Sequence, residues 1–180
     1  VLFRSALAHA EGLSHVELRQ HNLLSDPWPQ AAFDLAWCRW VAMFLPDLAP
    51  VLAGLEQSLR SGAAVVLHEY VHWDTFGLHP HGHAIARFGQ ACQRSFREAG
   101  GDPDVNRKLP ALLTARGWRI EELRPLPVAG GPGSMTARWM ERFVEIYGPR
   151  LQELGLWSVE EAGQAAAEIS GAMDNPGSFW

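Results

Sequence analysis

Two apolar runs separated by a helical pattern dominate the first half of the chain. Phe33–Cys38 and Ala63–Leu67 each have the length and residue types of a buried strand. Between them, apolar residues recur at spacings of three and four from Leu48 to Leu59, which predicts an amphipathic helix. Asp47 is its predicted N-cap and Ser61-Gly62 its predicted stop. The pattern therefore predicts a strand, a helix and a second strand in succession.

This order also predicts where a ligand would bind. Two apolar strands joined by one helix are most simply parallel neighbours in a sheet that is covered on both faces. In such sheets, ligands bind at the carboxyl ends of the strands. Polar and aromatic side chains follow both predicted strands, and we expect them to share one edge of the sheet: Cys38, Arg39, Trp40, His68, Glu69 and Tyr70.

Weaker patterns predict further elements around this unit. Val16–Arg19 alternates apolar and polar residues like a half-buried strand, and Trp118–Leu123 is predicted as an edge strand. The predicted helices are Ala6–Ala10, Ile85–Phe96, Leu109–Leu113, one containing Trp139, Phe143, Ile146 and Tyr147, and Ser158–Met173, the last opened by a capping box. We expect an α/β sheet domain over residues 1–128 and an added helical cap of the same domain over residues 129–180.

Composition narrows the classes of function. A chain of 180 residues suits one domain, and a formal net charge of -5 gives no basic face for nucleic acid. No apolar run approaches the length of a membrane span. The two cysteines, Cys38 and Cys92, are too few for a disulfide scaffold and suit the reducing cytoplasm. We therefore expect a cytoplasmic protein; the sequence leaves the oligomeric state open.

The order of these motifs resembles the class I S-adenosylmethionine-dependent methyltransferases, in the branch that acts on small molecules. The resemblance extends from Val16 to about Leu126. It is carried by Asn22-Leu23 after one strand, by Phe33–Trp40, by Phe44–Asp47 and by Leu59–Leu67. It implies an incomplete Rossmann-like sheet with helices on both faces, and methyl transfer from S-adenosylmethionine to a small molecule.

The resemblance also implies roles for individual residues. Asn22 stands where the family often has an acid that bonds the adenine amino group, and Leu23 would contact the adenine ring. Cys38, Arg39 and Trp40 follow the strand whose end faces the methionine part of the cofactor. Either of two residues after the next strand, His68 or Glu69, could serve as the base. Three aromatic residues are the expected substrate contacts, namely Tyr70, Trp73 and Trp139.

Three departures from the family pattern affect how well this chain could bind the cofactor. The glycine-rich loop after the first strand is absent, and the position of the ribose-binding acid falls in Val1–Ser5, which need not be native sequence. The last strand of the family would follow Trp180. We therefore expect a fragment that binds cofactor poorly by itself. A non-catalytic binding module with a methyltransferase-like sheet is an alternative that the missing loop favours.

A zinc peptidase is a second alternative. His68-Glu69-Tyr70-Val71-His72 matches H-E-x-x-H, in which two histidines on one helical face hold zinc and the glutamate acts as base. His79 or Glu98 would then be the third ligand. This hypothesis requires a helix through His72, whereas Gly62 and the β-branched pair Val65-Val66 favour a strand that ends near His68. The remaining histidines, His79, His81 and His83, are expected in a solvated loop rather than a metal site.

Overall fold

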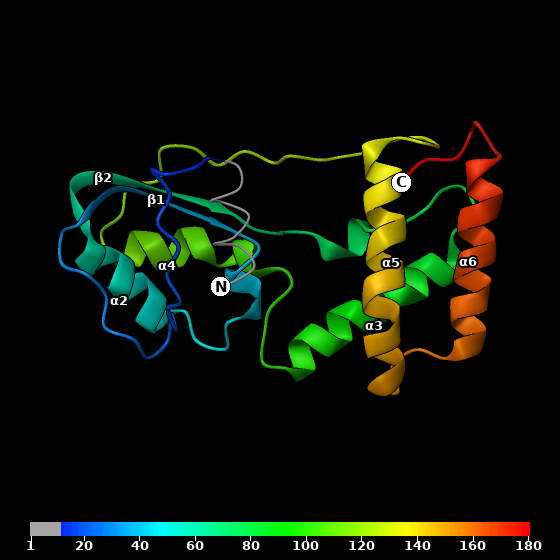
Figure 1. The fold of residues 1–180 in the computed structure, drawn as a ribbon, viewed down its shortest axis with the longest axis horizontal. Helices are drawn as coiled ribbons and strands as arrows, with labels where there is room; N and C mark the ends of the chain where they lie inside the picture. The colour runs from blue at the N-terminus through cyan, green and yellow to red at the C-terminus, as the bar shows by residue number, and fades with distance from the viewer. Residues whose placement is uncertain (1–11) are drawn as a thin grey trace. The chain divides into compact units, whose positions relative to one another are not determined.

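The structure is a computed structural model that describes residues 12–180 (Figure 1). The described elements are β1 (Phe33–Arg39), η1 (Ala42–Phe44), α2 (Ala49–Ser58), β2 (Leu59–His68), η2 (Trp73–Thr75), α3 (His83–Glu98), η3 (Val105–Arg107), α4 (Leu109–Ala115), α5 (Met135–Glu153) and α6 (Val159–Met173), where η marks a short 3-10 helix. This mixed α/β architecture confirms the predicted fold class. The predicted helix at Ala6–Ala10 lies outside the described residues.

The two strands are parallel neighbours. Backbone N–H groups on the β1 side donate to carbonyls on the β2 side in the same order along both chains: Ala31 to Gln57 at 2.9 Å, Ala32 to Ser58 at 2.8 Å and Trp40 to His68 at 3.1 Å. Ascending partners on both sides define a parallel pair. The predicted parallel pairing of the two apolar runs is therefore confirmed.

The chain divides into two compact units, and the division crosses both strands. The first unit contains the residues up to Ala36 together with Asp47–Val65, and the second contains Trp37–Pro46 together with Val66–Trp180. The carboxyl ends of β1 and β2 thus belong to the second unit, together with the four later helices. The predicted division at residue 128 stays a prediction.

Helix α2 belongs to the first unit, and it buries Leu52, Gly54 and Ser58. Asp47 Oδ1 accepts the N–H of Ala49 at 2.9 Å, so this side chain stabilises the start of the helix, although Leu48 is the N-cap residue. The helix ends at Ser58, three residues before the predicted stop, because Leu59 is already extended. The indole of Trp28 lies against Gly54, where any Cβ would collide with it. Glycine at position 54 therefore lets the preceding loop pack directly on the helix.

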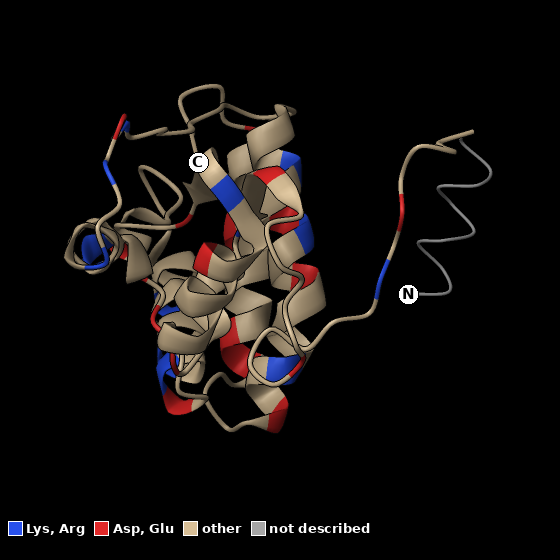
Figure 2. Cartoon of the chain, turned by 90° about the vertical axis from the view of Figure 1, so that its left-hand side faces the viewer, with Lys and Arg blue, Asp and Glu red and all other residues tan. Residues whose placement is uncertain are grey.

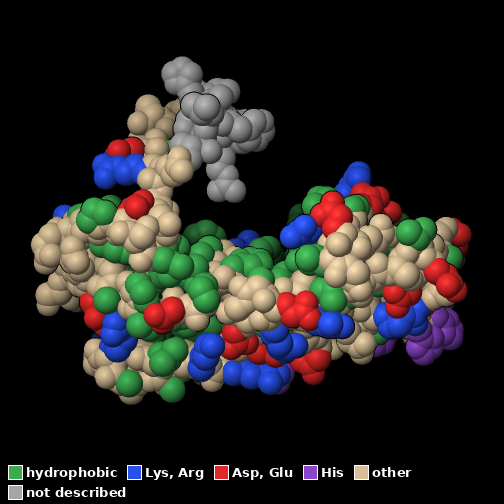
Figure 3. Space-filling model, turned by 90° about the horizontal axis from the view of Figure 1, so that it is seen from below, with side chains coloured by type: hydrophobic (Ala, Val, Ile, Leu, Met, Phe, Trp, Pro, Cys, Tyr) green, Lys and Arg blue, Asp and Glu red, His purple; other side chains and the backbone are tan. Residues whose placement is uncertain are grey.

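One face of the sheet is exposed, although we expected buried strands. Phe33, Leu35 and Trp37 alternate along β1 and so share a face, and they are 49%, 58% and 61% exposed. An apolar sheet face is buried only where a second layer covers it, and no such layer covers these three side chains among residues 12–180. Figure 3 likewise shows apolar side chains at the surface of the face that it draws.

Helices α3, α5 and α6 form the core of the second unit, where they pack against one another (Figure 1). Ile85, Phe88, Cys92 and Phe96 point from α3 into this core, and each is at most 6% exposed. The predicted helix at Ile85–Phe96 is confirmed, as is the capping box that opens α6. Basic and acidic residues are interspersed along the helices (Figure 2). Within residues 12–180, no helix is long and apolar enough to cross a membrane.

Two predicted strands do not form. Within the described part of the chain, Val16–Arg19 and Trp118–Leu123 lie outside any strand. Their apolar side chains are accordingly exposed, with Val16 at 42% and Leu123 at 68%. A strand pattern becomes a strand only when a neighbouring backbone completes the hydrogen-bond ladder. Here the described sheet ends at two strands.

Candidate functional site

The ends of β1 and β2 bring six predicted site residues to one edge of the sheet. The N–H of Trp40 donates to the carbonyl of His68 at 3.1 Å, which joins the two strand ends directly. The six residues follow parallel strands and all belong to the second unit: Cys38, Arg39, Trp40, His68, Glu69 and Tyr70. Their predicted proximity is confirmed, and we refer to these six residues as the strand-end cluster.

Glu69 ties the two strand ends together. Its Oε1 accepts the N–H groups of Val41 at 2.8 Å and Ala42 at 3.0 Å, and the Sγ of Cys38 lies 3.5 Å from the same oxygen. The residue is 7% exposed, and its Oε2 is buried without a hydrogen-bond partner among the described residues. A carboxylate held in this way has little access to a ligand. Glu69 therefore positions the chain after β1.

Trp40 adopts a backbone conformation that is unfavourable for a bulky residue. Its φ is 53°, in the left-handed region, directly after β1. The indole stacks on the ring of Tyr70 with centroids 5.4 Å apart and planes 6° from parallel, and the guanidinium of Arg39 lies 3.9 Å from its centroid. Strained conformations persist only where surrounding contacts enforce them, and they concentrate at functional sites. Here stacking and the neighbouring bond from Val41 to Glu69 enforce it.

Two side chains of the strand-end cluster hold their protons more tightly than usual, namely Cys38 and Tyr70. Burial raises the pKa of the Cys38 thiol to about 11, and the adjacent charge of Glu69 adds to the effect. Burial likewise raises the pKa of the Tyr70 hydroxyl to about 12, against an opposing effect of Arg39. Both groups are therefore neutral at pH 7. Neither is an anionic nucleophile or base under physiological conditions.

The two predicted tryptophan contacts lie in different surroundings. Trp139 on α5 is 40% exposed, and its ring centroid lies 5.8 Å from that of Trp40, so α5 contributes an accessible ring beside the strand-end cluster. Trp73 is only 4% exposed and packs against Tyr70 and Phe76. The structure thus places Trp73 in the core, where it packs against Tyr70 and is not accessible as a substrate contact.

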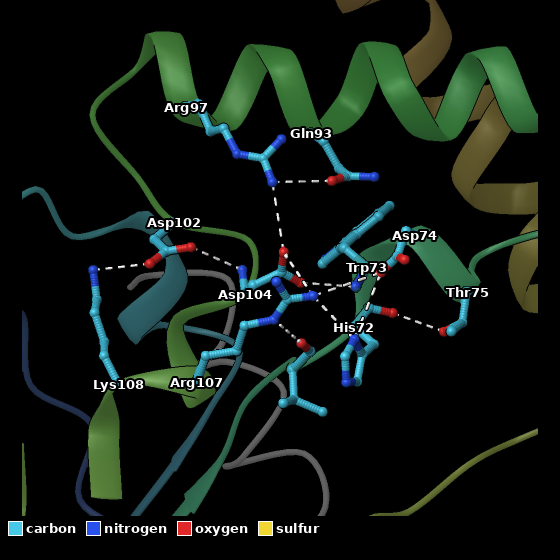
Figure 4. Close-up of polar contacts among 11 residues, drawn as sticks. His72, Trp73, Asp74, Thr75, Gln93, Arg97, Asp102, Asp104, Arg107 and Lys108 are labelled. Atoms are coloured by element: carbon cyan, nitrogen blue, oxygen red, sulfur yellow. Dashed lines mark hydrogen bonds and ion pairs between the residues drawn. The ribbon is translucent and has the colours of Figure 1, made fainter. Parts of the chain in front are cut away.

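A polar network that no sequence pattern indicated holds the segment after β2. Asp104, 8% exposed, accepts the N–H of Trp73 at 2.8 Å, and its other oxygen lies 3.5 Å from Arg97 and 3.6 Å from Arg107 (Figure 4). Asn106 donates from its side chain to the carbonyl of Glu69 at 3.2 Å and from its backbone to Tyr70 at 3.1 Å. The contacts of Asp104 with Trp73 and of Asn106 with Glu69 join residues more than 30 positions apart, which periodicity cannot reveal.

The predicted adenine contacts lie in the first unit. Asn22 Oδ1 accepts the N–H of Leu24 at 3.0 Å, and the N–H of Asn22 donates to Asp26 at 2.7 Å. These bonds form a tight Asx turn that also fixes Leu23. One lone pair of the Asn22 oxygen remains for a further donor. The adenine-binding roles of Asn22 and Leu23 stay predictions.

The zinc peptidase hypothesis is wrong. His68 ends a β-strand rather than lying within a helix, so it cannot share a helical face with His72. His72 Nδ1 lies 3.0 Å from a guanidinium nitrogen of Arg107. The proposed third ligands are also engaged elsewhere, since His79 stacks on Phe179 with centroids 5.0 Å apart and Glu98 bonds to Arg94 at 2.7 Å. His79 and His81 are exposed, as expected for a solvated loop, whereas His83 is the first residue of α3. Figure 3 shows histidine side chains at the surface of the face that it draws.

A known protein family matches the part of the chain that contains the two strands and the helix between them. A family model described as a methyltransferase domain matches residues 3–67, which include β1, α2 and all of β2 except His68. Residues 3–67 are thus similar to part of a methyltransferase domain. The resemblance to class I S-adenosylmethionine-dependent methyltransferases is thus confirmed for this range. A search of the curated proteins found no match.

The methyltransferase domain generally uses S-adenosylmethionine, and the strand-end cluster fits part of that molecule. The reactive sulfur of S-adenosylmethionine is a cation, and aromatic faces attract cations within about 6 Å of the ring. The Trp40 ring is already covered by the Arg39 guanidinium and by Tyr70, so the accessible aromatic face beside the cluster is that of Trp139, and the buried carboxylate of Glu69 lies at the same strand ends. The residues present therefore suit the methionine end of the cofactor.

Proposed function

We propose that this protein transfers a methyl group from S-adenosylmethionine to a small-molecule acceptor bound at the strand-end cluster. The observation that carries the proposal is the coincidence of two results: the methyltransferase match covers the strand, helix and strand, and the residues just beyond both strands converge. Binding at the carboxyl ends of parallel strands is the general rule for such sheets.

The cofactor, when bound, supplies an electrophilic methyl group, and the protein has to align the acceptor with it and exclude water. We assign the methionine end to Cys38, Arg39 and Trp40. The partly exposed ring of Trp139 and the ring of Tyr70 would contact the acceptor. An acceptor with an apolar or aromatic portion suits these walls.

The two candidate bases have different roles in this proposal. Glu69 is buried, and its Oε1 already accepts two backbone N–H groups, so it acts as a positioning residue. The ring of His68 lies at the end of β2, with its centroid 6.3 Å from that of Trp40. His68 is therefore the group that we expect to take a proton from a hydroxyl or amine acceptor.

Calorimetric titration of the full-length natural protein with S-adenosylhomocysteine tests the cofactor assignment. We expect binding, weakened about tenfold by Trp40→Leu, since this ring holds Arg39 and Tyr70 in place through contacts worth about 1 kcal/mol each. Trp37→Leu is the matched control, because this indole lies on the exposed sheet face of the same strand. Absence of binding by the natural protein would remove the enzyme proposal and favour the non-catalytic module.

A further inference from the structure

A groove with an apolar floor runs between α5 and α6, in the part of the chain that follows the methyltransferase match. Its volume is about 510 Å³, and Trp157 contributes to its lining. Val144 on α5 and Ala162, Ala166 and Ile169 on α6 supply apolar side chains to it. A volume of this size lies within the range of about 300–1,000 Å³ that is typical of small-molecule sites.

The groove has one acidic end. The short connection through Gly155 and Trp157 makes α5 and α6 antiparallel neighbours, which lie side by side in Figure 1. Antiparallel packing places Glu141, in the first half of α5, near the last turn of α6. Met173 and the C-cap residue Asp174 line the groove from that last turn. Two carboxylates therefore lie at the end that is remote from Trp157.

The negative charge at this end is uncompensated. The carboxyl end of a helix carries a partial negative charge that normally attracts a basic residue. The last turn of α6 has none, and its C-cap is itself acidic. Glu145 is paired with Arg142 at 2.7 Å, but neither Glu141 nor Asp174 forms an ion pair within residues 12–180. None of the described residues that line the groove is Lys, Arg or His.

A backbone carbonyl without its helical donor belongs to a residue that lines the same groove. Pro149 lies inside α5 and has no N–H, so the carbonyl of Glu145, four residues earlier, loses its helical donor. Both residues line the groove. All charged side chains that line the groove are therefore carboxylates, which accept hydrogen bonds, and they lie beside an apolar floor.

We propose that this groove binds a small organic cation: an amine whose ammonium group lies between Glu141 and Asp174 and whose apolar body extends toward Trp157. An ammonium group donates hydrogen bonds and accepts none, which matches the acidic end. The apolar body removes the floor formed by Val144 and Ala166 from water. A carboxylate ligand of the same shape would meet like charge and is excluded.

Titration of the full chain with three ligands of one shape tests the proposal. The probes are 4-phenylbutylamine, its neutral analogue 4-phenylbutanol and its anionic analogue 4-phenylbutyrate, each followed by isothermal calorimetry at pH 7.4. We expect the amine to bind at least about fivefold more tightly than the alcohol, because charge-assisted hydrogen bonds exceed neutral ones. The butyrate should bind more weakly than either.

Variants distinguish this groove from general attraction to an acidic protein. Glu141→Gln with Asp174→Asn should reduce the affinity for the amine to that of the alcohol and leave the alcohol unchanged. Glu153→Gln with Glu160→Gln removes the same charge from the same helices at residues outside the groove lining, and should have no effect. Ala166→Phe, at an exposed position, should weaken the amine and the alcohol together by filling the groove.

Three results would overturn the proposal. One is absence of amine binding up to 10 mM, taken as about the weakest binding of interest. Another is equal affinity for the amine and the butyrate. The third is an equal loss of amine affinity in the two double variants, which would show that net charge rather than this groove attracts the ligand.

Discussion

The carboxylate of Glu69, at the end of β2, accepts the backbone N–H of Val41, which follows β1, at 2.8 Å. This single bond joins the segments beyond two neighbouring parallel strands. Ala42 donates to the same oxygen at 3.0 Å. The arrangement explains how Trp40, next in sequence to Val41, is held at a φ of 53°. One buried side chain thereby determines the shape of the strand-end cluster.

Loss of the Glu69 carboxylate should destabilise the protein. Glu69→Ala leaves two N–H groups without their acceptor, one of them buried, and we expect the free energy of unfolding to fall by about 2–4 kcal/mol. Glu69→Gln keeps an acceptor and should cost only about 1 kcal/mol. Urea unfolding followed by circular dichroism measures both. Glu153→Ala, an exposed control, should change stability by less than about 0.5 kcal/mol. Equal effects of the three variants would contradict the stabilising role of the bonds from Val41 and Ala42 to Glu69.

Alkaline pH should weaken the fold through Cys38. The folded state holds the thiol proton more tightly than the unfolded chain, with a pKa of about 11 against the usual 9.0. The stabilisation is therefore complete below pH 9 and is lost as the pH rises toward 11. Unfolding free energies measured across this range should fall less steeply in Cys38→Ala. An unchanged slope would show that the thiol does not titrate as described.

The same shift predicts slow chemical labelling of Cys38. At pH 8 a thiol with a pKa of about 11 has about one hundredth of the thiolate fraction of a thiol with the usual 9.0, and the thiolate is the reactive species. We expect iodoacetamide to modify Cys38 far more slowly in the folded protein than in urea, as followed by peptide mass spectrometry. Rapid labelling of the folded protein would mean that Cys38 is not buried beside Glu69.

Asp104 should anchor the segment that follows β2. Asp104→Ala removes the acceptor of the Trp73 N–H, a bond of 2.8 Å, and should cost about 1–3 kcal/mol. Hydrogen exchange at the Trp73 amide should accelerate in this variant and much less in Asp104→Asn. The exposed neighbour Asp74 provides the control, and its replacement by Asn should leave exchange at Trp73 unchanged. Slow exchange in Asp104→Ala would show that the network in Figure 4 is dispensable.

Two glycines inside helices should respond in opposite directions to alanine. A Cβ at Gly148 on α5 would lie 2.8 Å from Cζ3 of Trp157, so Gly148→Ala should destabilise the protein by about 1–3 kcal/mol. A Cβ at Gly163 on α6 would meet nothing within 4 Å, so Gly163→Ala should stabilise it by up to about 1 kcal/mol. Thermal unfolding compares the two directly. Stabilisation by both would show that Trp157 does not pack against Gly148.

Sequence patterns predicted most local elements and one edge of the sheet. The strand, helix and strand from Phe33 to His68 and the capping box at Ser158 follow from short-range periodicity and from side chains that bond their own backbone. The same patterns predicted that Trp40 and His68 lie close together, because parallel strands end on the same edge of a sheet. The strands predicted at Val16–Arg19 and Trp118–Leu123 were wrong, because a strand also needs a neighbouring strand with which to form hydrogen bonds.

Tertiary structure alone decided the roles within the site. Whether Glu69 faces a ligand or is buried depends on the N–H groups of Val41 and Ala42, which are 28 and 27 positions away in sequence. The burial of Trp73, the exposure of Trp139 and the anchoring by Asp104 depend in the same way on distant residues. The sequence by itself determined which residue types reach the strand ends, because backbone periodicity is local. Burial and charge pairing arise only when distant segments pack together, so only the folded chain separates a positioning carboxylate from a base.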